Sequence, residues 1–139
     1  MIVLDTNVLS EALRPRPADS VRRWMEAQPA SDLFTTTICE AEMFYGLRLM
    51  AAGRRRTALE RAVEAIFAEE FTGRVLAFDR AAARSFADIA ARRHRSGRPI
   101  REFDAQIAAI AASNRAMLAT RNVEDFVGCG VEVLNPWQT

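Results

Sequence analysis

The stretch Met1-Ile2-Val3-Leu4-Asp5-Thr6-Asn7 decides the fold. A short apolar run ends there in a carboxylate, and residues that favour the start of a helix follow at once. Buried strands of this kind belong to parallel sheets, which bind ligands at the carboxyl ends of their strands. We therefore predict that Asp5 lies at the ligand-binding edge of a parallel β-sheet.

Two more acidic residues fall at comparable places. Glu42 follows the run Leu33-Phe34-Thr35, and Asp104 opens the helix that leads into Met117-Leu118-Ala119. Bringing like charges to about 4 Å costs roughly 4 kcal/mol per pair at an effective dielectric near 20, so such a cluster needs a divalent cation. The three acids predict a metal-dependent hydrolytic site.

Segments with strand and helix patterns alternate along the chain. This order implies a three-layer α/β/α domain with a central parallel β-sheet, formed by residues 1–139 as a single domain. The expected strands are 2–4, 33–35, 75–78, 117–119 and 131–134, and the expected helices are 7–13, 18–28, 38–50, 54–71, 81–95 and 104–114.

Composition is that of an ordinary globular protein. Hydrophobic residues make up 50% of the chain, charged residues 27%, and the net charge is +1, which excludes a disordered or strongly basic protein. The sequence has no apolar run of membrane-spanning length, no pattern of an export signal, and only two cysteines. We therefore expect a cytoplasmic protein without a membrane partner.

All basic residues of the chain are arginines, and several precede Asp104. An arginine fork grips phosphate bidentately, so this cluster could hold a polyanion beside the acids. The alternative is an ordinary solvated helix face. The candidates for contact with RNA are Arg93, Arg95, Arg98 and Arg101.

Each acid also has a purely structural explanation. Asp5 and Asp104 could simply favour the amino ends of their helices. Glu42 shares a helical stripe with Ile38, Tyr45 and Leu49, which predicts that its carboxylate points toward apolar packing. Glu40 has apolar neighbours as well, so periodicity leaves the choice between the two glutamates open.

Four motifs in order resemble those of the PIN-domain endoribonucleases, specifically the VapC and FitB type toxins of bacterial toxin–antitoxin pairs. Together they cover nearly the whole chain. They are Ile2-Val3-Leu4-Asp5-Thr6-Asn7; Ala41-Glu42-Met43-Phe44-Tyr45-Gly46; Asp104-Ala105-Gln106-Ile107-Ala108-Ala109; and Leu118-Ala119-Thr120-Arg121-Asn122 with Asp125-Phe126, followed by Leu134-Asn135-Pro136-Trp137.

The resemblance implies that Asp5, Glu42 and Asp104 bind Mg²⁺ or Mn²⁺, and it selects Glu42 over Glu40. Asn122 stands at the family's fourth acidic position, where Asp125 nearby could supply the missing charge. The same resemblance implies hydrolysis of RNA phosphodiester bonds, inhibition by a cognate antitoxin, and contact with operator DNA only through that antitoxin. The residues that could orient ligands or water are Thr6 and Thr120.

The helix expected at 38–50 is apolar on more than one face, which predicts a homodimer.

Three other functions compete with this interpretation. A response-regulator receiver needs a late lysine, and the chain has none. A haloacid-dehalogenase-type phosphatase needs an aspartate where Asn7 stands. A catalytically silent binding module in a repressor complex is the remaining rival, and Asn122 is its one support.

Overall fold

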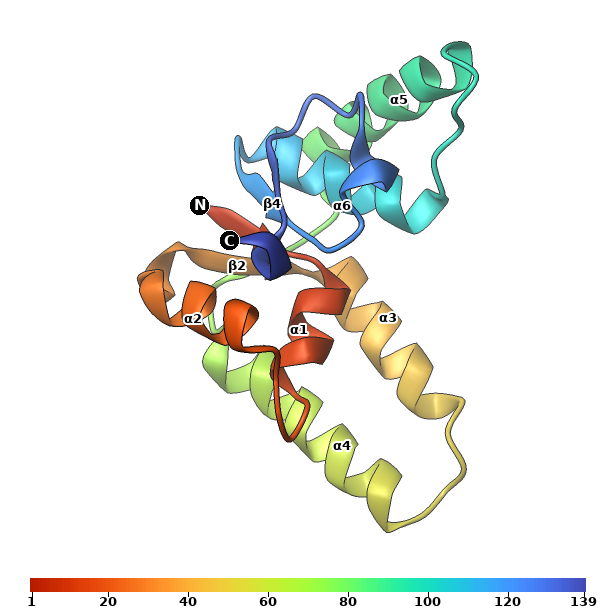
Figure 1. The fold of residues 1–139 in the computed structure, drawn as a ribbon. Coiled ribbons are helices and arrows are strands. Elements are labelled where there is room, and N and C mark those ends of the chain that lie inside the picture. Colours follow the sequence, from red (N-terminus) through yellow and green to blue (C-terminus); the bar gives the residue numbers. More distant parts are fainter.

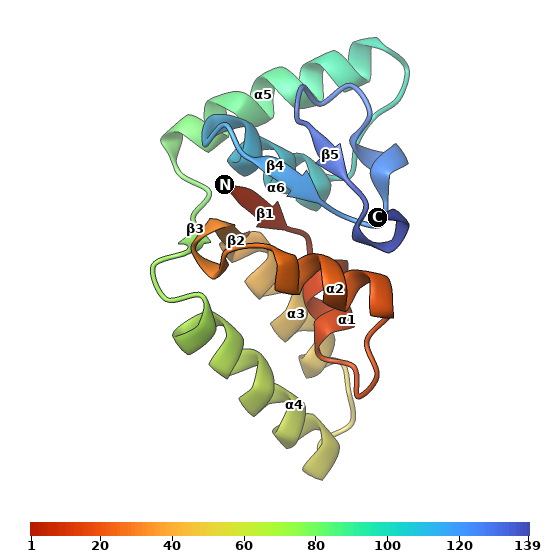
Figure 2. The ribbon, with the colours of Figure 1, turned by 60° about the vertical axis from the view of Figure 1, so that its left-hand side comes forward.

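Five short parallel strands form the centre of the protein (Figures 1 and 2). The computed structural model describes all residues, 1–139. The sheet order is β3-β2-β1-β4-β5, so the chain first winds to one side of β1 and then returns to build the other side. The strands are β1 (Ile2–Leu4), β2 (Leu33–Thr36), β3 (Val75–Leu76), β4 (Met117–Ala119) and β5 (Val133–Leu134).

Six α-helices flank this sheet. As Figure 2 shows, α5 and α6 cover one face, and the first four helices lie on the other. This arrangement is the three-layer α/β/α fold expected from the alternation of elements. The helices are α1 (Thr6–Ala12), α2 (Asp19–Ala27), α3 (Thr37–Arg48), α4 (Arg54–Ala65), α5 (Arg80–Arg95) and α6 (Glu102–Ser113).

Helix α6 is the central helix of the hydrophobic core. Its alanines allow close approach of both the sheet and α5, while Ile107 and Ile110 fill the remaining space and are fully buried. On the sheet, Leu4 and Leu118 are buried as well. The core thus fixes the positions of β1, β4 and α6, whose ends carry the candidate acids.

Pairing between β1 and β4 defines a switch point in the strand order. Val3 pairs with Leu118 and Leu4 with Ala119, and the backbone N–H of Asp5 donates to the carbonyl of Ala119 at 2.9 Å. The chain leaves these two neighbouring strands in opposite directions around the sheet. Ligands of open α/β sheets bind in the crevice that such a reversal opens.

Three expectations about local structure need correction. The strands expected at 75–78 and 131–134 are only two residues long, Val75–Leu76 and Val133–Leu134. The helix expected at 54–71 ends at Ala65 and continues as a π-helical turn, Ile66–Glu70. Ile66 and Phe67 of this turn still face the core, so the periodic burial of apolar residues continues beyond the α-helix.

The third correction concerns α3. The stripe shared by Glu42, Tyr45 and Leu49 does not face apolar packing, since Tyr45 is 64% and Leu49 is 70% exposed. The buried stripe of α3 is instead Cys39, Met43 and Leu47. Glu42 therefore lies at the border between the buried and the exposed side.

No helix in the fold combines the length and the apolar character needed to cross a membrane.

Candidate active site

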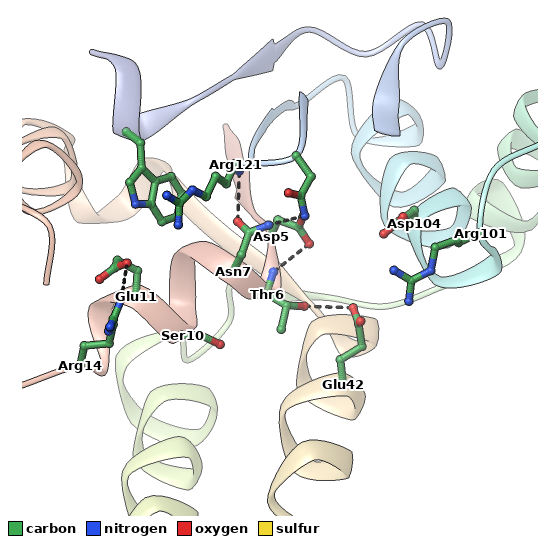
Figure 3. A pocket seen from close by; sticks show the side chains of 12 residues that line it. Asp5, Thr6, Asn7, Ser10, Glu11, Arg14, Glu42, Arg101, Asp104 and Arg121 are labelled. Atoms are coloured by element: carbon green, nitrogen blue, oxygen red, sulfur yellow. Dashed lines mark hydrogen bonds and ion pairs between the residues drawn. The ribbon is translucent and has the colours of Figure 1, made fainter. Parts of the chain in front are cut away.

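A polar cleft of about 490 Å³ opens at the carboxyl ends of β1 and β4 (Figure 3). We call it the acidic cleft. Three carboxylates predicted from the sequence line it, and three arginines surround them. Its lining residues are Asp5, Thr6, Asn7, Ser10, Glu11, Arg14, Glu42, Arg101, Asp104, Arg121, Asn122 and Trp137.

Asp5 caps helix α1 and also lines the acidic cleft. A structural role at the start of the helix is therefore compatible with a role in the site. As the N-cap of α1, its Oδ1 accepts a hydrogen bond from the backbone N–H of Thr6 at 2.8 Å. Its Oδ2 accepts from the hydroxyl of Thr120 at 2.7 Å. Only 5% of Asp5 is exposed. The helix cap and Thr120 hold the carboxylate in one orientation toward the cleft.

Thr6 connects Asp5 with Glu42. The hydroxyl of Thr6 donates to Oε1 of Glu42 at 3.0 Å, across the gap between α1 and α3 (Figure 3). Glu40, in the first turn of α3, does not line the cleft. The structure thus brings Glu42, rather than Glu40, next to Asp5.

Asp104 faces Asp5 and Glu42 from α6, with Arg101 beside it (Figure 3). It is the third residue of α6, which begins at Glu102 rather than at Asp104 as expected. No protein donor is hydrogen-bonded to its carboxylate. Arg101 does not form an ion pair with either acid, but its positive charge lowers the pKa of both Asp104 and Glu42.

Burial raises the pKa of all three carboxyl groups above their ordinary values. Mutual repulsion adds to this effect: Glu42 raises the pKa of Asp5, and Asp5 raises that of Asp104. The hydrogen bonds from Thr120 and Thr6 act in the opposite direction on Asp5. The cleft therefore concentrates negative charge that its own arginines do not fully neutralise.

The donor atoms of the acidic cleft suit a hard cation. Carboxylates and hydroxyls line the cleft, whereas no histidine or cysteine does. No three acidic, histidine or cysteine side chains of the protein lie close enough together to enclose a metal ion. Mg²⁺ needs no such cage, because it is usually held by one or two carboxylates and keeps several waters. The residues present fit a hydrated Mg²⁺ or Mn²⁺ ion.

Asn122 and Asp125, proposed around the fourth acidic position, occupy different places. Asn122 lines the acidic cleft, and its backbone N–H donates to the hydroxyl of Thr120 at 3.1 Å. Asp125 lies outside the lining of this cleft, yet its charge raises the pKa of Asp5 and Asp104. Asp125 thus influences the site through the repulsion of its negative charge, although its side chain does not line the cleft.

One of the four arginines predicted to contact RNA cannot do so. Arg93 is only 6% exposed, and its guanidinium donates to the carbonyls of Arg98, Asp125 and Val127 at 2.7, 2.8 and 2.9 Å. These bonds occupy it inside the protein. Arg95 and Arg98 are exposed but away from the cleft, so of the four only Arg101 lines it.

Several cleft residues were not predicted as site residues. Asn7 donates to Thr120 at 3.1 Å, and it accepts the backbone N–H of Arg121 at 3.2 Å. The guanidinium of Arg121 lies 5.0 Å from the ring centroid of Trp137. Asn7, Arg121 and Trp137 all fall within the sequence motifs quoted above, and this position was the only available signal for them.

Comparison with known proteins shows to which family the chain belongs. A family model described as PIN domain matches residues 2–126. The chain is similar to the VapC ribonuclease Y4jK of Sinorhizobium fredii, with 41% identity over 99% of both chains. It is also similar to the toxin FitB of Neisseria gonorrhoeae, with 36% identity over 99% of both. A solved structure of FitAB bound to a DNA fragment, IR36, superposes with a TM-score of 0.91 at 36% identity, covering 99% of this chain and 96% of the other.

Proposed function

Since the chain belongs to the PIN domain family, we propose that it is a metal-dependent endoribonuclease and the toxin of a toxin–antitoxin pair. The observation that carries this proposal is the meeting of Asp5, Glu42 and Asp104 in one polar cleft. The pKa values of these three carboxyl groups are raised, and no arginine forms an ion pair with them. Such a cluster favours the binding of a divalent cation. The names of the similar proteins, a ribonuclease and a toxin, support the choice of reaction and biological role.

In this mechanism, Asp5 and Asp104 would hold Mg²⁺ or Mn²⁺, and Glu42 would complete the negative site. When bound there, the ion would lower the pKa of a water and offset the charge that develops on the phosphodiester. Thr120 fixes the carboxylate of Asp5, and Thr6 fixes that of Glu42, so both are oriented before substrate arrives. Arg101 at the rim attracts the RNA phosphates.

The antitoxin is the proposed protein partner. FitB is named a toxin, and the FitAB structure contains DNA, which supports a complex that reaches operator DNA through the antitoxin. The exposed Tyr45 and Leu49 on α3 support a homodimer, because apolar side chains of this size are typical of interface cores. A cytoplasmic location accords with an RNA substrate and with two free, buried cysteines.

Incubating total RNA with the purified protein tests this proposal. We expect fragments in the presence of Mg²⁺ or Mn²⁺ and none with EDTA, as seen on a denaturing gel. A protein that binds its antitoxin and the operator complex but cuts no RNA with any divalent cation would instead be the silent binding module, which Asn122 at the fourth acidic position favours.

Replacement of Glu42 separates the two glutamates of α3. We expect Glu42→Gln to reduce Mg²⁺-dependent cleavage by about 10- to 100-fold, because the site loses a negative charge while the amide oxygen can still accept the hydrogen bond from Thr6. Glu40→Gln is the matched control and should cleave like the unmodified protein, since Glu40 lies outside the cleft. Initial rates and Mg²⁺ titration by calorimetry measure both effects; equal behaviour of the two variants would contradict the assignment of Glu42.

A further inference from the structure

We propose that a second polar groove beside the acidic cleft binds the nucleotide next to the cleaved bond, with Arg121 holding its phosphate. This groove, about 440 Å³ in volume, is called the side groove here. The inference rests on the proposed ribonuclease function and adds to it the residues that select the base. The side groove is lined by Arg121, Asn122, Val123, Glu124, Asp125, Asn135 and Gln138.

The two hollows meet at Arg121 and Asn122, which line both. Arg121 directly follows Thr120, whose hydroxyl is hydrogen-bonded to Asp5. A strand with its reacting phosphate at Asp5 therefore passes Arg121 as it leaves the acidic cleft on this side. The side groove is thus the next place that the strand reaches.

Arg121 is held at this border by contacts on both sides. Its backbone N–H donates to Asn7 at 3.2 Å (Figure 3), and its guanidinium lies 5.0 Å from the ring centroid of Trp137. Asn7 and Trp137 are uncharged, and Arg121 forms no ion pair with Glu124 or Asp125 of the same groove. The guanidinium therefore remains available to an anionic ligand, with Trp137 limiting its motion.

The chemistry of the side groove fits a base rather than a second phosphate. Three carboxamides, Asn122, Asn135 and Gln138, offer both donors and acceptors, and Glu124 and Asp125 offer acceptors. Two carboxylates repel a phosphate, whereas the N–H groups of a base edge bind to them. Single-stranded RNA is read through hydrogen bonds to such exposed base edges.

The hollow on the other side of the acidic cleft has a different character. It shares Thr6, Ser10, Arg14 and Glu42 with the cleft, and Arg55 adds a further positive charge. The rest of its lining is largely apolar, and it contains none of the carboxamides that line the side groove. This contrast favours the side groove as the side that reads a base.

A randomised single-stranded RNA provides the test. The fragments produced by the purified protein with Mg²⁺ are sequenced, and the base preference next to the cut is compared among variants. We expect Gln138→Ala and Glu124→Gln to flatten the preference at one flanking position, with a smaller loss of total cleavage. A purely structural role of these residues would not change the base preference.

Arg121 is tested by binding as well as by cleavage. With a fluorescein-labelled single-stranded RNA in EDTA, we expect Arg121→Ala to weaken binding about tenfold and to lower the slope of log affinity against log salt by about 0.7, as for the loss of one phosphate contact. KM should rise with kcat nearly unchanged. Trp137→Leu should act in the same direction, and Trp137→Phe should act less because it keeps a ring. Arg23→Ala is the control, since Arg23 is exposed and lines neither the acidic cleft nor the side groove.

The outcomes separate this inference from the proposed function. If the unmodified protein cleaves no RNA, the proposed function fails, and binding in EDTA still tests Arg121. If it cleaves with a base preference that none of these variants alters, and Arg121→Ala binds RNA normally, the side groove is not a nucleotide site. An Arg121→Ala variant that loses only affinity for the antitoxin would also overturn the inference.

Discussion

Asp104→Asn is expected to reduce RNA cleavage about a thousandfold and, at the same time, to stabilise the metal-free protein. Loss of a metal-binding carboxylate removes several kcal/mol of transition-state stabilisation, and about 1.4 kcal/mol corresponds to a factor of ten in rate. The fold should tolerate the change, because the carboxylate of Asp104 accepts no hydrogen bond from the protein. Asp5→Asn is a less clean variant, since it disturbs the bond from Thr120.

The stabilisation follows from the direction of the pKa shift. Burial and the nearby charge of Asp5 raise the pKa of Asp104 in the folded state. Ionised Asp104 therefore lowers the free energy of unfolding at pH values above its ordinary pKa of 3.8. This penalty grows until the pH passes the raised pKa of the folded state, and it disappears below pH 3.8. Asparagine carries no charge, so the variant avoids this penalty at neutral pH.

Thermal unfolding in EDTA measures the gain. We expect a rise in Tm of about 3 °C at pH 7.5, because water screens these half-buried groups and leaves roughly 1 kcal/mol. The difference from the unmodified protein should shrink toward pH 4, and Mg²⁺ should stabilise the unmodified protein more than the variant. Undiminished cleavage by folded Asp104→Asn would rule out the metal site proposed here.

Arg93→Met is expected to lower the Tm by about 10 °C. The side chain is buried, and its loss leaves three carbonyl groups without their donor. The three carbonyls are partly buried, so the loss of each donor costs about 1 kcal/mol, at the lower end of the range for an unpaired polar group, and a total near 3 kcal/mol is expected. Methionine retains most of the volume, which separates the hydrogen bonds from simple packing.

Arg95→Met is the control for this variant, because Arg95 is exposed on the same helix and makes no hydrogen bond or ion pair through its side chain. Its Tm should change by less than about 2 °C. Differential scanning calorimetry of the two proteins makes the comparison. Equal stability of Arg93→Met and Arg95→Met would mean that the guanidinium of Arg93 does not hold the 123–129 segment in place.

Much of the architecture was predictable because the periodic patterns were strong. Alternation of strands and helices predicted the parallel sheet, and the buried residues Ile107, Ile110 and Ala111 recur at helical spacing on α6. The edge strands were overestimated, since a run of apolar residues does not reveal how many of them find a pairing partner. In β5 only Val133 and Leu134 do so.

Arg93 illustrates what periodicity and residue chemistry each contribute. Its helical spacing from Ala82 and Ile89 puts Arg93 on the buried stripe of α5, whereas the phosphate-binding chemistry of arginine predicted a contact with RNA. The burial follows the spacing, and the predicted RNA contact is wrong. The carbonyls that satisfy it belong to residues 125 and 127, more than thirty positions away, together with the nearby carbonyl of Arg98. The turn at Gly97, with φ of +76°, brings the chain back toward Arg93.

The composition of the candidate site was predictable only in part. Asp5, Glu42 and Asp104 follow recognisable positions on strands and helices, so their meeting could be foreseen. The contact between Arg121 and Trp137 could not, because it depends on how the last residues of the chain return across the open end of the sheet.

The burial of both cysteines makes the protein convenient to label. Burial raises the pKa of Cys39 to about 11, and that of Cys129 is raised as well, so neither is a reactive thiolate at neutral pH. A cysteine introduced at the exposed Glu64 on α4 would react with a maleimide dye ahead of them. A single fluorophore can thus be attached without first replacing the native thiols, which would leave cavities in the core.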